Sequence, residues 1–236
     1  MSYRHMLELL YRIARYNLKI IFASRFIYFF VAAILFYLLI TILNILSPDA
    51  NSTESDVYFL LIFPGILLIF YPAAFGIQND VDTHMLETLF GIPNYRYKVY
   101  LVRLVIIYCA VYILLLGLGM VSAVALTPLP VFEMAFQLMF PVFFLGCLTF
   151  MVSTVVKNGN GTAVTMVILG IILWITTGFM ETSKWNIFLN PFNLPENYSD
   201  VVWASVILKN RLILATGMFL SVLYGLLNLQ KREKFI

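Results

Sequence analysis

Six long apolar segments, separated by shorter polar connections, dominate the chain. They are residues 26–46, 57–77, 102–126, 132–155, 162–180 and 211–229. Each has roughly the 20 residues that a helix needs to cross the hydrocarbon core of a bilayer. Their apolar residues are continuous, whereas the strands of a membrane barrel alternate over about ten residues. The pattern therefore predicts an all-α membrane protein with six transmembrane helices.

The composition supports one membrane domain and no large soluble one. Of the 236 residues, 62% are hydrophobic and 11% are charged, whereas about a quarter of a soluble domain is charged. The connections are too short for a second domain, so we predict a single transmembrane domain over residues 1–236. Cys109 and Cys147 lie inside apolar segments, where we expect them to pack rather than to form a disulfide or a metal site.

Lysine and arginine are concentrated on one side of the predicted membrane. With the N-terminus in the cytoplasm, 12 of the 15 lie on the inner side and 3, namely Lys184, Lys209 and Arg211, on the outer side. Because basic residues are enriched in cytoplasmic connections, we predict that both termini are cytoplasmic. The protein is then a multi-pass protein of a bacterial cytoplasmic membrane. The inner residues are Arg4, Arg12, Arg15, Lys19, Arg25, Arg96, Lys98, Arg103, Lys157, Lys231, Arg232 and Lys234.

A basic amphipathic helix is predicted over residues 3–24. Its charged residues recur at spacings of three and four, from Arg4 to Lys19, and leucine and aromatic residues occupy the other face. Such a helix is suited to the headgroup layer of the inner leaflet, and a cytosolic helix packed on another subunit is the alternative. The stretch lacks a small-residue cleavage site, so we do not interpret it as a secretory signal.

The longest outer connection, residues 181–210, has two possible arrangements. It either dips back into the membrane interface or remains an ordinary outer loop. In the first case Phe188, Phe192 and Trp203 are the expected interfacial anchors.

The connection between the second and third spans is charged, and it reads GIQNDVDTHMLETLFGIPNYRYKVYLVRL over residues 76–104. Asn79 or Asp80 can cap a short helix, and acidic residues in its first turn complement the helix dipole. Gly91 and Pro93 supply its end. We therefore predict a short cytoplasmic helix over residues 79–91.

One face of this helix is apolar and needs a covering surface. Val81, Met85 and Leu89 are four residues apart, with Leu86 and Phe90 beside them. The membrane, the ends of the spans or a partner protein could cover this face. Anionic inner-leaflet lipids repel the acidic first turn, which favours a protein partner. A capped turn that only joins two spans is the alternative.

The sequence shows no sign of an energy source or a catalytic centre. Ion-coupled carriers place ionisable residues at membrane depth, yet the centres of the six segments contain none, and Glu133 lies at an outer edge. The phosphate-binding motif G-x-x-x-x-G-K-[ST] is absent. His5 and His84 are both cytoplasmic, so catalysis or a metal centre within the spans has no support. The basic residues follow the membrane boundary, which gives no indication of nucleic-acid binding.

The order of an acidic pair, Leu-Glu-Thr-Leu, Gly-Ile-Pro and basic residues leading into a span resembles the cytoplasmic segment of type 2 ABC exporter permeases. That family has an amphipathic elbow helix, six spans, and a coupling helix between the second and third spans. The resemblance covers nearly the whole chain. It implies that residues 80–90 dock on a separate nucleotide-binding subunit, which holds ATP and Mg²⁺. The implied docking residues are Asp80, Asp82, Thr83 and Glu87 on the polar side and Met85, Leu86 and Phe90 on the apolar side.

This resemblance, together with the absent motifs, predicts a permease subunit without its own ATPase activity, working with a second permease copy or a paralogue. With 21 Phe and 14 Tyr, the walls of a path suit an amphipathic or lipid-like cargo. A related permease in cytochrome maturation or bacteriocin immunity, a membrane scaffold without transport, and an ion-coupled carrier are the alternatives.

Overall fold

The computed structural model describes residues 26–47, 52–82 and 96–229, and within these ranges every regular element is a helix. Six of the helices are long and apolar enough to cross a membrane, which confirms the predicted all-α class and number of spans. The predicted helix over residues 3–24 lies outside the described residues. The elements are α2 (Phe26–Leu46), α3 (Glu54–Asp82), the π-helix η1 (Arg96–Leu101), α5 (Val102–Ala125), α6 (Val131–Val156), α7 (Gly159–Phe179) and α8 (Asp200–Asn228).

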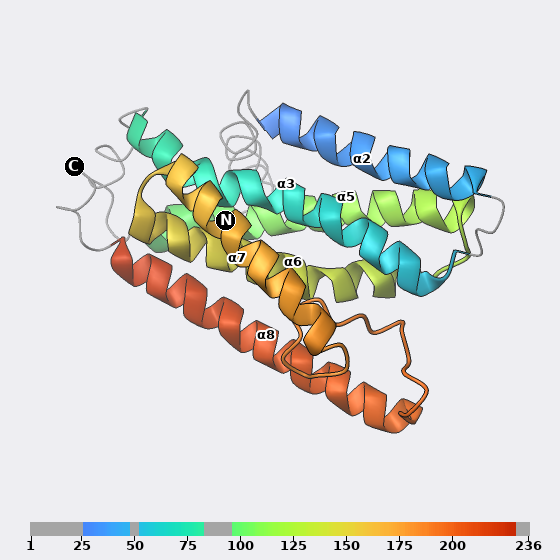
Figure 1. The fold of residues 1–236 in the computed structure, drawn as a ribbon. Coiled ribbons are helices and arrows are strands. Elements are labelled where there is room, and N and C mark those ends of the chain that lie inside the picture. The colour runs from blue at the N-terminus through green and yellow to red at the C-terminus, as the bar shows by residue number, and fades with distance from the viewer. Residues whose placement is uncertain (1–25, 48–51, 83–95, 230–236) are drawn as a thin grey trace, which may run out of the picture.

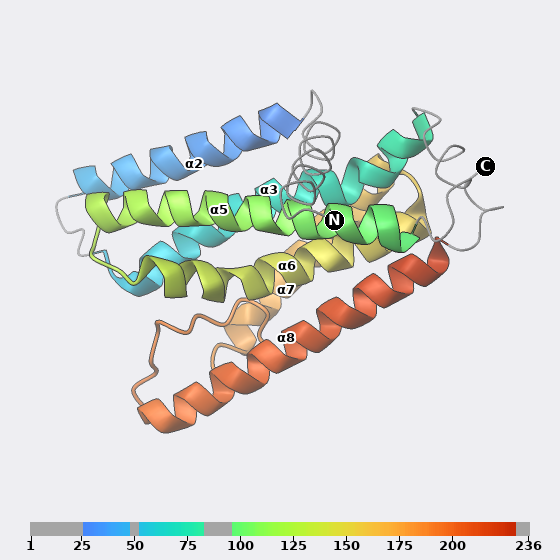
Figure 2. The ribbon, with the colours of Figure 1, turned by 180° about the vertical axis from the view of Figure 1, so that it is seen from behind.

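Consecutive long helices run in opposite directions along one elongated bundle (Figures 1 and 2). One end of the bundle carries the α5–α6 and α7–α8 connections, and we call it the outer end. The other end carries the end of α3, the start of α5 and the α6–α7 turn, and we call it the inner end. These names follow the orientation that the charge pattern predicts.

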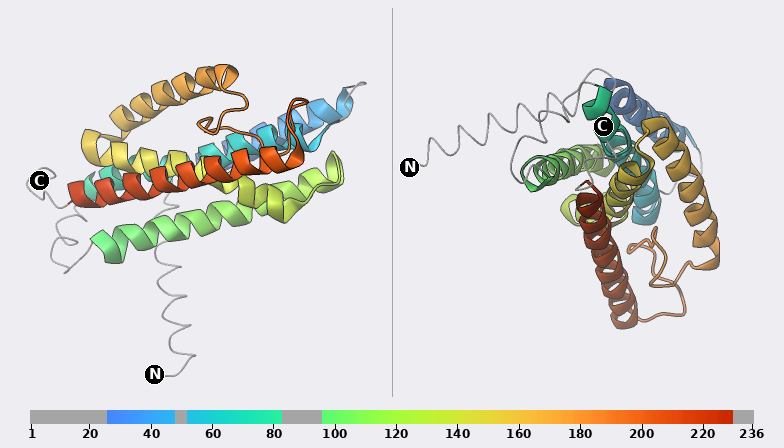
Figure 3. Two further views of the ribbon diagram at one scale, coloured as in Figure 1. Left: turned by 90° about the horizontal axis from the view of Figure 1, so that it is seen from below. Right: turned by 90° about the vertical axis from the view of Figure 1, so that its left-hand side faces the viewer.

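Helices α3 and α6 form the centre of the bundle, and the other four surround them (Figure 3). Small residues allow this close contact: a Cβ atom added to Gly146 of α6 would lie 2.5 Å from Ile69 Cδ1 of α3. A Cβ atom on Gly65 would lie 2.9 Å from Val142 Cγ2. Close approach through glycine is a common way for membrane helices to gain van der Waals contact, because lipid offers them no hydrophobic driving force.

Helix α8 is longer than the sequence pattern predicts. The expected span begins at residue 211, but the helix begins at Asp200, so part of the expected outer loop is helical. Asn210 and Arg211 are buried inside the bundle, while the neighbouring Lys209 is exposed. The polar residues stay in the helix because the outer connection supplies their hydrogen-bond partners.

The outer connection, residues 180–199, folds back against the helices as a series of turns. Phe188 and Trp203 are 3% and 5% exposed, so protein rather than lipid surrounds these two expected interfacial anchors. Phe192 packs against the same core. The side chains are buried because Phe188 meets the Trp174 ring and the Trp203 indole donates to the Pro191 carbonyl at 3.3 Å.

The α6–α7 turn is tight and holds the inner end together. Lys157 has a left-handed backbone with φ of 61°, and Asn158 caps α7 by accepting a hydrogen bond from the Gly161 N–H at 3.1 Å. The first backbone N–H of α7, from Gly159, donates to the side-chain oxygen of Gln78 on α3. The last turns of α3 are therefore tied to the start of α7.

Candidate functional site

The predicted break at Asn79 and Asp80 is wrong, because α3 continues through both residues to Asp82. A helix cap requires a residue with non-helical backbone angles, and both residues instead lie within the final turns of a 29-residue helix. A separate helix that begins at Asn79 or Asp80 is therefore excluded. The second span and the acidic part of the motif are one continuous helix.

Asp80 is the central residue of the inner end. It is 0% exposed, and the two terminal nitrogens of Arg103 approach its two carboxylate oxygens at 2.7 and 3.3 Å. Tyr100 adds a hydroxyl hydrogen bond of 3.1 Å to the carboxylate, and the Arg103 guanidinium lies 5.5 Å from the centre of the Tyr100 ring. Such two-point pairing is the strongest geometry that arginine and carboxylate form.

This geometry corrects two expectations about charge. Asp80 is buried and paired, so it is not a surface contact for a partner, and Arg103 points into the bundle although the charge pattern counts it among the basic residues of the inner side. Burial of an isolated charge in an apolar environment costs on the order of several kcal/mol, because the charge loses its hydration. Pairing compensates both charges for this loss. Their pairing joins the last turn of α3 to the first turn of α5.

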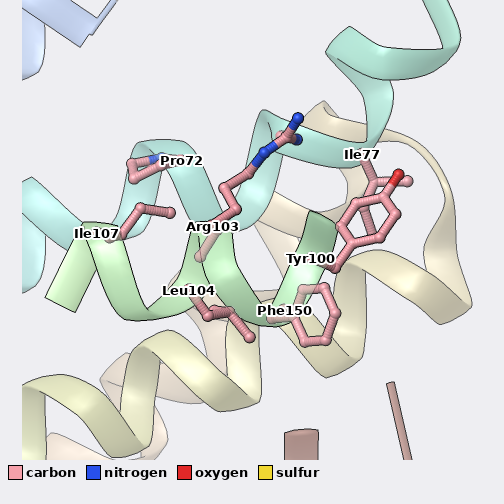
Figure 4. Close-up of a pocket in the computed structure, with 9 residues that line it drawn as sticks. Pro72, Ile77, Tyr100, Arg103, Leu104, Ile107 and Phe150 are labelled. Carbon is pink, nitrogen blue, oxygen red and sulfur yellow. The ribbon is translucent and has the colours of Figure 1, made fainter. Parts of the chain in front are cut away.

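A small cavity lies beside this pair, between α3, α5 and α6 (Figure 4). Figure 4 shows Arg103 and Tyr100 extending from the start of the third span toward α3. The cavity has a volume of about 20 Å³, enough for one water molecule. Arg103 Nε is buried and makes no hydrogen bond with the described residues, which makes it a donor for such a water.

Of the other predicted docking residues, Asp82 is the one that the structure describes. It is the last residue of α3 and is exposed at the inner end. Thr83, Met85, Leu86, Glu87 and Phe90 lie outside the described residues.

A second buried arginine, Arg211, lies at the outer end, and the sequence analysis does not single it out. It is 6% exposed, and its Nε and Nη1 atoms each donate a 2.9 Å hydrogen bond, to the side-chain oxygens of Gln137 and Asn210. Its Nη2 atom donates to the Leu189 carbonyl at 3.3 Å, and the guanidinium lies 5.3 Å from the Phe140 ring centre. No described carboxylate is within ion-pair distance of Arg211, so its partners are neutral.

Both arginines carry a sequence signal that could have revealed them. Arg103 lies inside the predicted third span, one residue from its start, and Arg211 is the first residue of the predicted sixth span. A charged residue within an apolar segment is rare and marks a paired or functional position. The charge pattern alone places both at the membrane boundary, so it does not predict their burial.

An apolar groove of about 650 Å³ runs between α2, α3, α6 and α7. Aromatic and aliphatic side chains line it, among them Phe36, Phe63 and Trp174. Its one hydroxyl group, on Thr149, is engaged with the Leu145 carbonyl at 2.7 Å. The groove therefore offers no free polar group from the described residues and is chemically suited to a hydrocarbon chain.

Comparisons with known proteins add no relative: no protein-family model, no curated protein and no solved structure matches this chain.

Proposed function

We propose that the chain is the membrane-spanning permease subunit of an ATP-driven ABC exporter in a bacterial cytoplasmic membrane. The observation that carries the proposal is the resemblance of residues 76–104 to a coupling segment, at the expected place in a six-helix order. A separate nucleotide-binding subunit binds ATP and Mg²⁺ and docks on this segment. The chain itself supplies the membrane path and no catalytic group.

The inner-end geometry supplies a physical route for coupling. The segment 83–95 leaves the end of α3 and returns at η1, and the Asp80–Arg103 pair joins the helices on both sides of it. A force on the segment therefore acts on α3 and the start of α5 together. Because α3 lies at the centre of the bundle, its movement reaches α2, α6 and α7, which it contacts directly.

The docking surface is smaller than the sequence suggested. Asp80 is excluded because its carboxylate is buried in the ion pair. The polar contacts are then Asp82, Thr83 and Glu87, and the apolar contacts are Met85, Leu86 and Phe90. The role of Asp80 is instead to hold α3 and α5 together through its ion pair with Arg103.

The apolar groove supports an amphipathic or lipid-like cargo. A hydrocarbon chain fits a surface made of aromatic and aliphatic side chains, whereas a sugar or an ion would lose its hydration there without gaining partners. The groove is partly open rather than enclosed. One copy therefore does not enclose a path, and we propose that a second permease copy or a paralogue completes it.

Reconstituted transport tests the proposal. The purified chain, incorporated into liposomes with its nucleotide-binding subunit, should move a fluorescent phospholipid between leaflets when ATP and Mg²⁺ are added. A proton gradient without ATP should drive no movement. Transport driven by the gradient alone would instead establish an ion-coupled carrier. A complex that binds the subunit without any ATP-dependent movement would support a scaffold.

A further inference from the structure

The outer connection is fastened by side chains that donate to its backbone carbonyls. Asn210 donates to the carbonyls of Lys184 and Asn186 at 2.9 and 2.8 Å. Arg211 and Tyr58 both donate to the Leu189 carbonyl at 3.3 Å. Buried carbonyl groups need partners, and here the partners come mainly from α8 with one from α3. Asn190 of the connection also donates to the carbonyl and hydroxyl oxygens of Ser55 on α3, at 3.1 and 2.9 Å. The position of the connection therefore depends on α8 and on the start of α3.

Arg211 links several elements at this end of the described structure. Its hydrogen bonds reach Gln137 on α6, Asn210 on α8 and Leu189 in the connection. The rigid fork of a guanidinium group can hold several acceptors at fixed angles, which lysine cannot do. Since all of these acceptors are neutral, water can replace them at lower cost than it could replace the carboxylate of an ion pair.

The fastened connection contributes one side chain to the lining of the apolar groove. Among the described residues that line the groove, Phe188 is the one that comes from the connection rather than from a helix. Its ring is 3% exposed and packs edge-on against Trp174 with ring centres 5.6 Å apart. Phe188 directly precedes Leu189, so the hydrogen bonds to the Leu189 carbonyl fix the backbone next to this ring.

We propose that Arg211 is a positioning residue that holds residues 186–190 as a plug over the outer end of the groove, and that cargo leaves the groove when this plug opens. The inference rests on the proposed transport function for its second half. Its first half, that Arg211 controls access to the groove, does not need a nucleotide-binding subunit and can be tested on the chain alone.

The plug is tested by amide hydrogen exchange of the chain in lipid nanodiscs. Arg211→Gln should accelerate exchange of peptides covering residues 186–192 by at least about tenfold, while peptides from α3 and α6 keep their wild-type rates. Lys209→Gln is the matched control, because it removes the same charge from an exposed neighbour on α8. Unchanged exchange at 186–192 in Arg211→Gln would overturn the proposal.

Faster amide exchange in all peptides would show that Arg211→Gln unfolds the bundle. In that case the Asn210→Ala variant would test the plug instead. It removes the bonds to two carbonyls of the connection and should accelerate exchange locally. Wild-type exchange in that variant would count against the plug.

Access to the groove is measured separately with Ile62→Cys, at a buried position of the groove lining, in a Cys109→Ser background. A water-soluble maleimide should label the introduced thiol about ten times faster with Arg211→Gln than with Lys209→Gln, and Arg211→Lys should lie between them. Buried Cys147 reports unfolding, because it reacts only if the bundle opens. Equal labelling of the introduced thiol with both glutamine variants would overturn the proposal. Faster labelling in a chain without ATP-dependent transport would retain the plug and reject only the proposed function.

Discussion

Asp80 and Arg103, which lie 23 residues apart in the sequence, form a two-point ion pair with distances of 2.7 and 3.3 Å at the inner end of the bundle. The pair links the end of the second span to the start of the third span. Each partner alone would leave a buried charge without compensation, so the two residues act as one unit.

A double-mutant cycle tests this unit. Asp80→Leu or Arg103→Leu alone should lower the free energy of unfolding by about 3–5 kcal/mol, because each leaves the other charge buried and unpaired. The double variant should lose much less, since a leucine pair leaves no charge. Chemical unfolding in detergent micelles, followed by circular dichroism, measures both quantities. Additive losses in the double variant would contradict the coupling.

Tyr100→Phe provides the matched small change at the same place. It removes one hydroxyl hydrogen bond of 3.1 Å to Asp80 and keeps the ring over Arg103. The expected loss is about 1.5–3 kcal/mol, the range for a hydrogen bond to a charged group. The same unfolding experiment measures it, and a loss as large as that of Asp80→Leu would contradict the view that Arg103 is the main partner.

Close packing of α3 against α6 gives a second prediction. Gly146→Val should lower the free energy of unfolding by about 1–3 kcal/mol, because the new side chain collides with Ile69 in a filled core. Gly117→Ala is the control, since no heavy atom lies within 4 Å of a Cβ atom there. It should be neutral or stabilising by about 1 kcal/mol or less. Equal effects at the two positions would show that the helices are not in contact at Gly146.

Much of the fold follows from hydrophobicity alone. The first span is predicted with the same ends, 26–46, because no charged residue interrupts it and only Thr41 and Asn44 are neither apolar nor aromatic. The second and sixth spans are predicted too short, because Asp80, Asn210 and Arg211 look like residues of a boundary. Each stays helical and buried through a partner elsewhere in the chain, such as Arg103 or the carbonyls of the outer connection. A local pattern contains no information on such distant pairs.

The sequence predicts the location of the candidate site but not the roles of its residues. The location of the inner end follows from the order of acidic residues, a glycine-proline end and basic residues. The role of Asp80 does not follow, because an aspartate at the start of a polar stretch is more often a cap than a buried partner. The groove and the plug depend on how four helices and a connection pack, which periodicity does not encode.

Orientation in the membrane gives a third prediction. Ser183→Cys in the outer connection should be labelled by an impermeant maleimide added to intact cells, in a Cys109→Ser background. An impermeant reagent should reach Asp82→Cys at the inner end only after the cells are opened. These results follow from the excess of basic residues on the inner side. Labelling of Asp82→Cys in intact cells would reverse the orientation.

The apolar groove gives a fourth prediction. Gly170→Leu adds a side chain to the groove lining and should lower ATP-dependent movement of a fluorescent phospholipid by at least about tenfold, because the groove no longer accepts a hydrocarbon chain. Gly178→Leu is the matched control on the same helix, outside the groove and in open space. Transport assays in proteoliposomes compare the two variants. Equal transport would exclude the groove from the path.

The central claim is that the segment following α3 receives the motion of a nucleotide-binding subunit. The most direct measurement is the ATPase rate of the purified subunit with and without this chain in nanodiscs, together with their binding. The wild-type chain should bind the subunit and raise its rate, whereas Glu87→Arg and Leu86→Asp should abolish both effects and leave the unfolding free energy of the chain unchanged. Full binding and full stimulation by both variants would contradict the account.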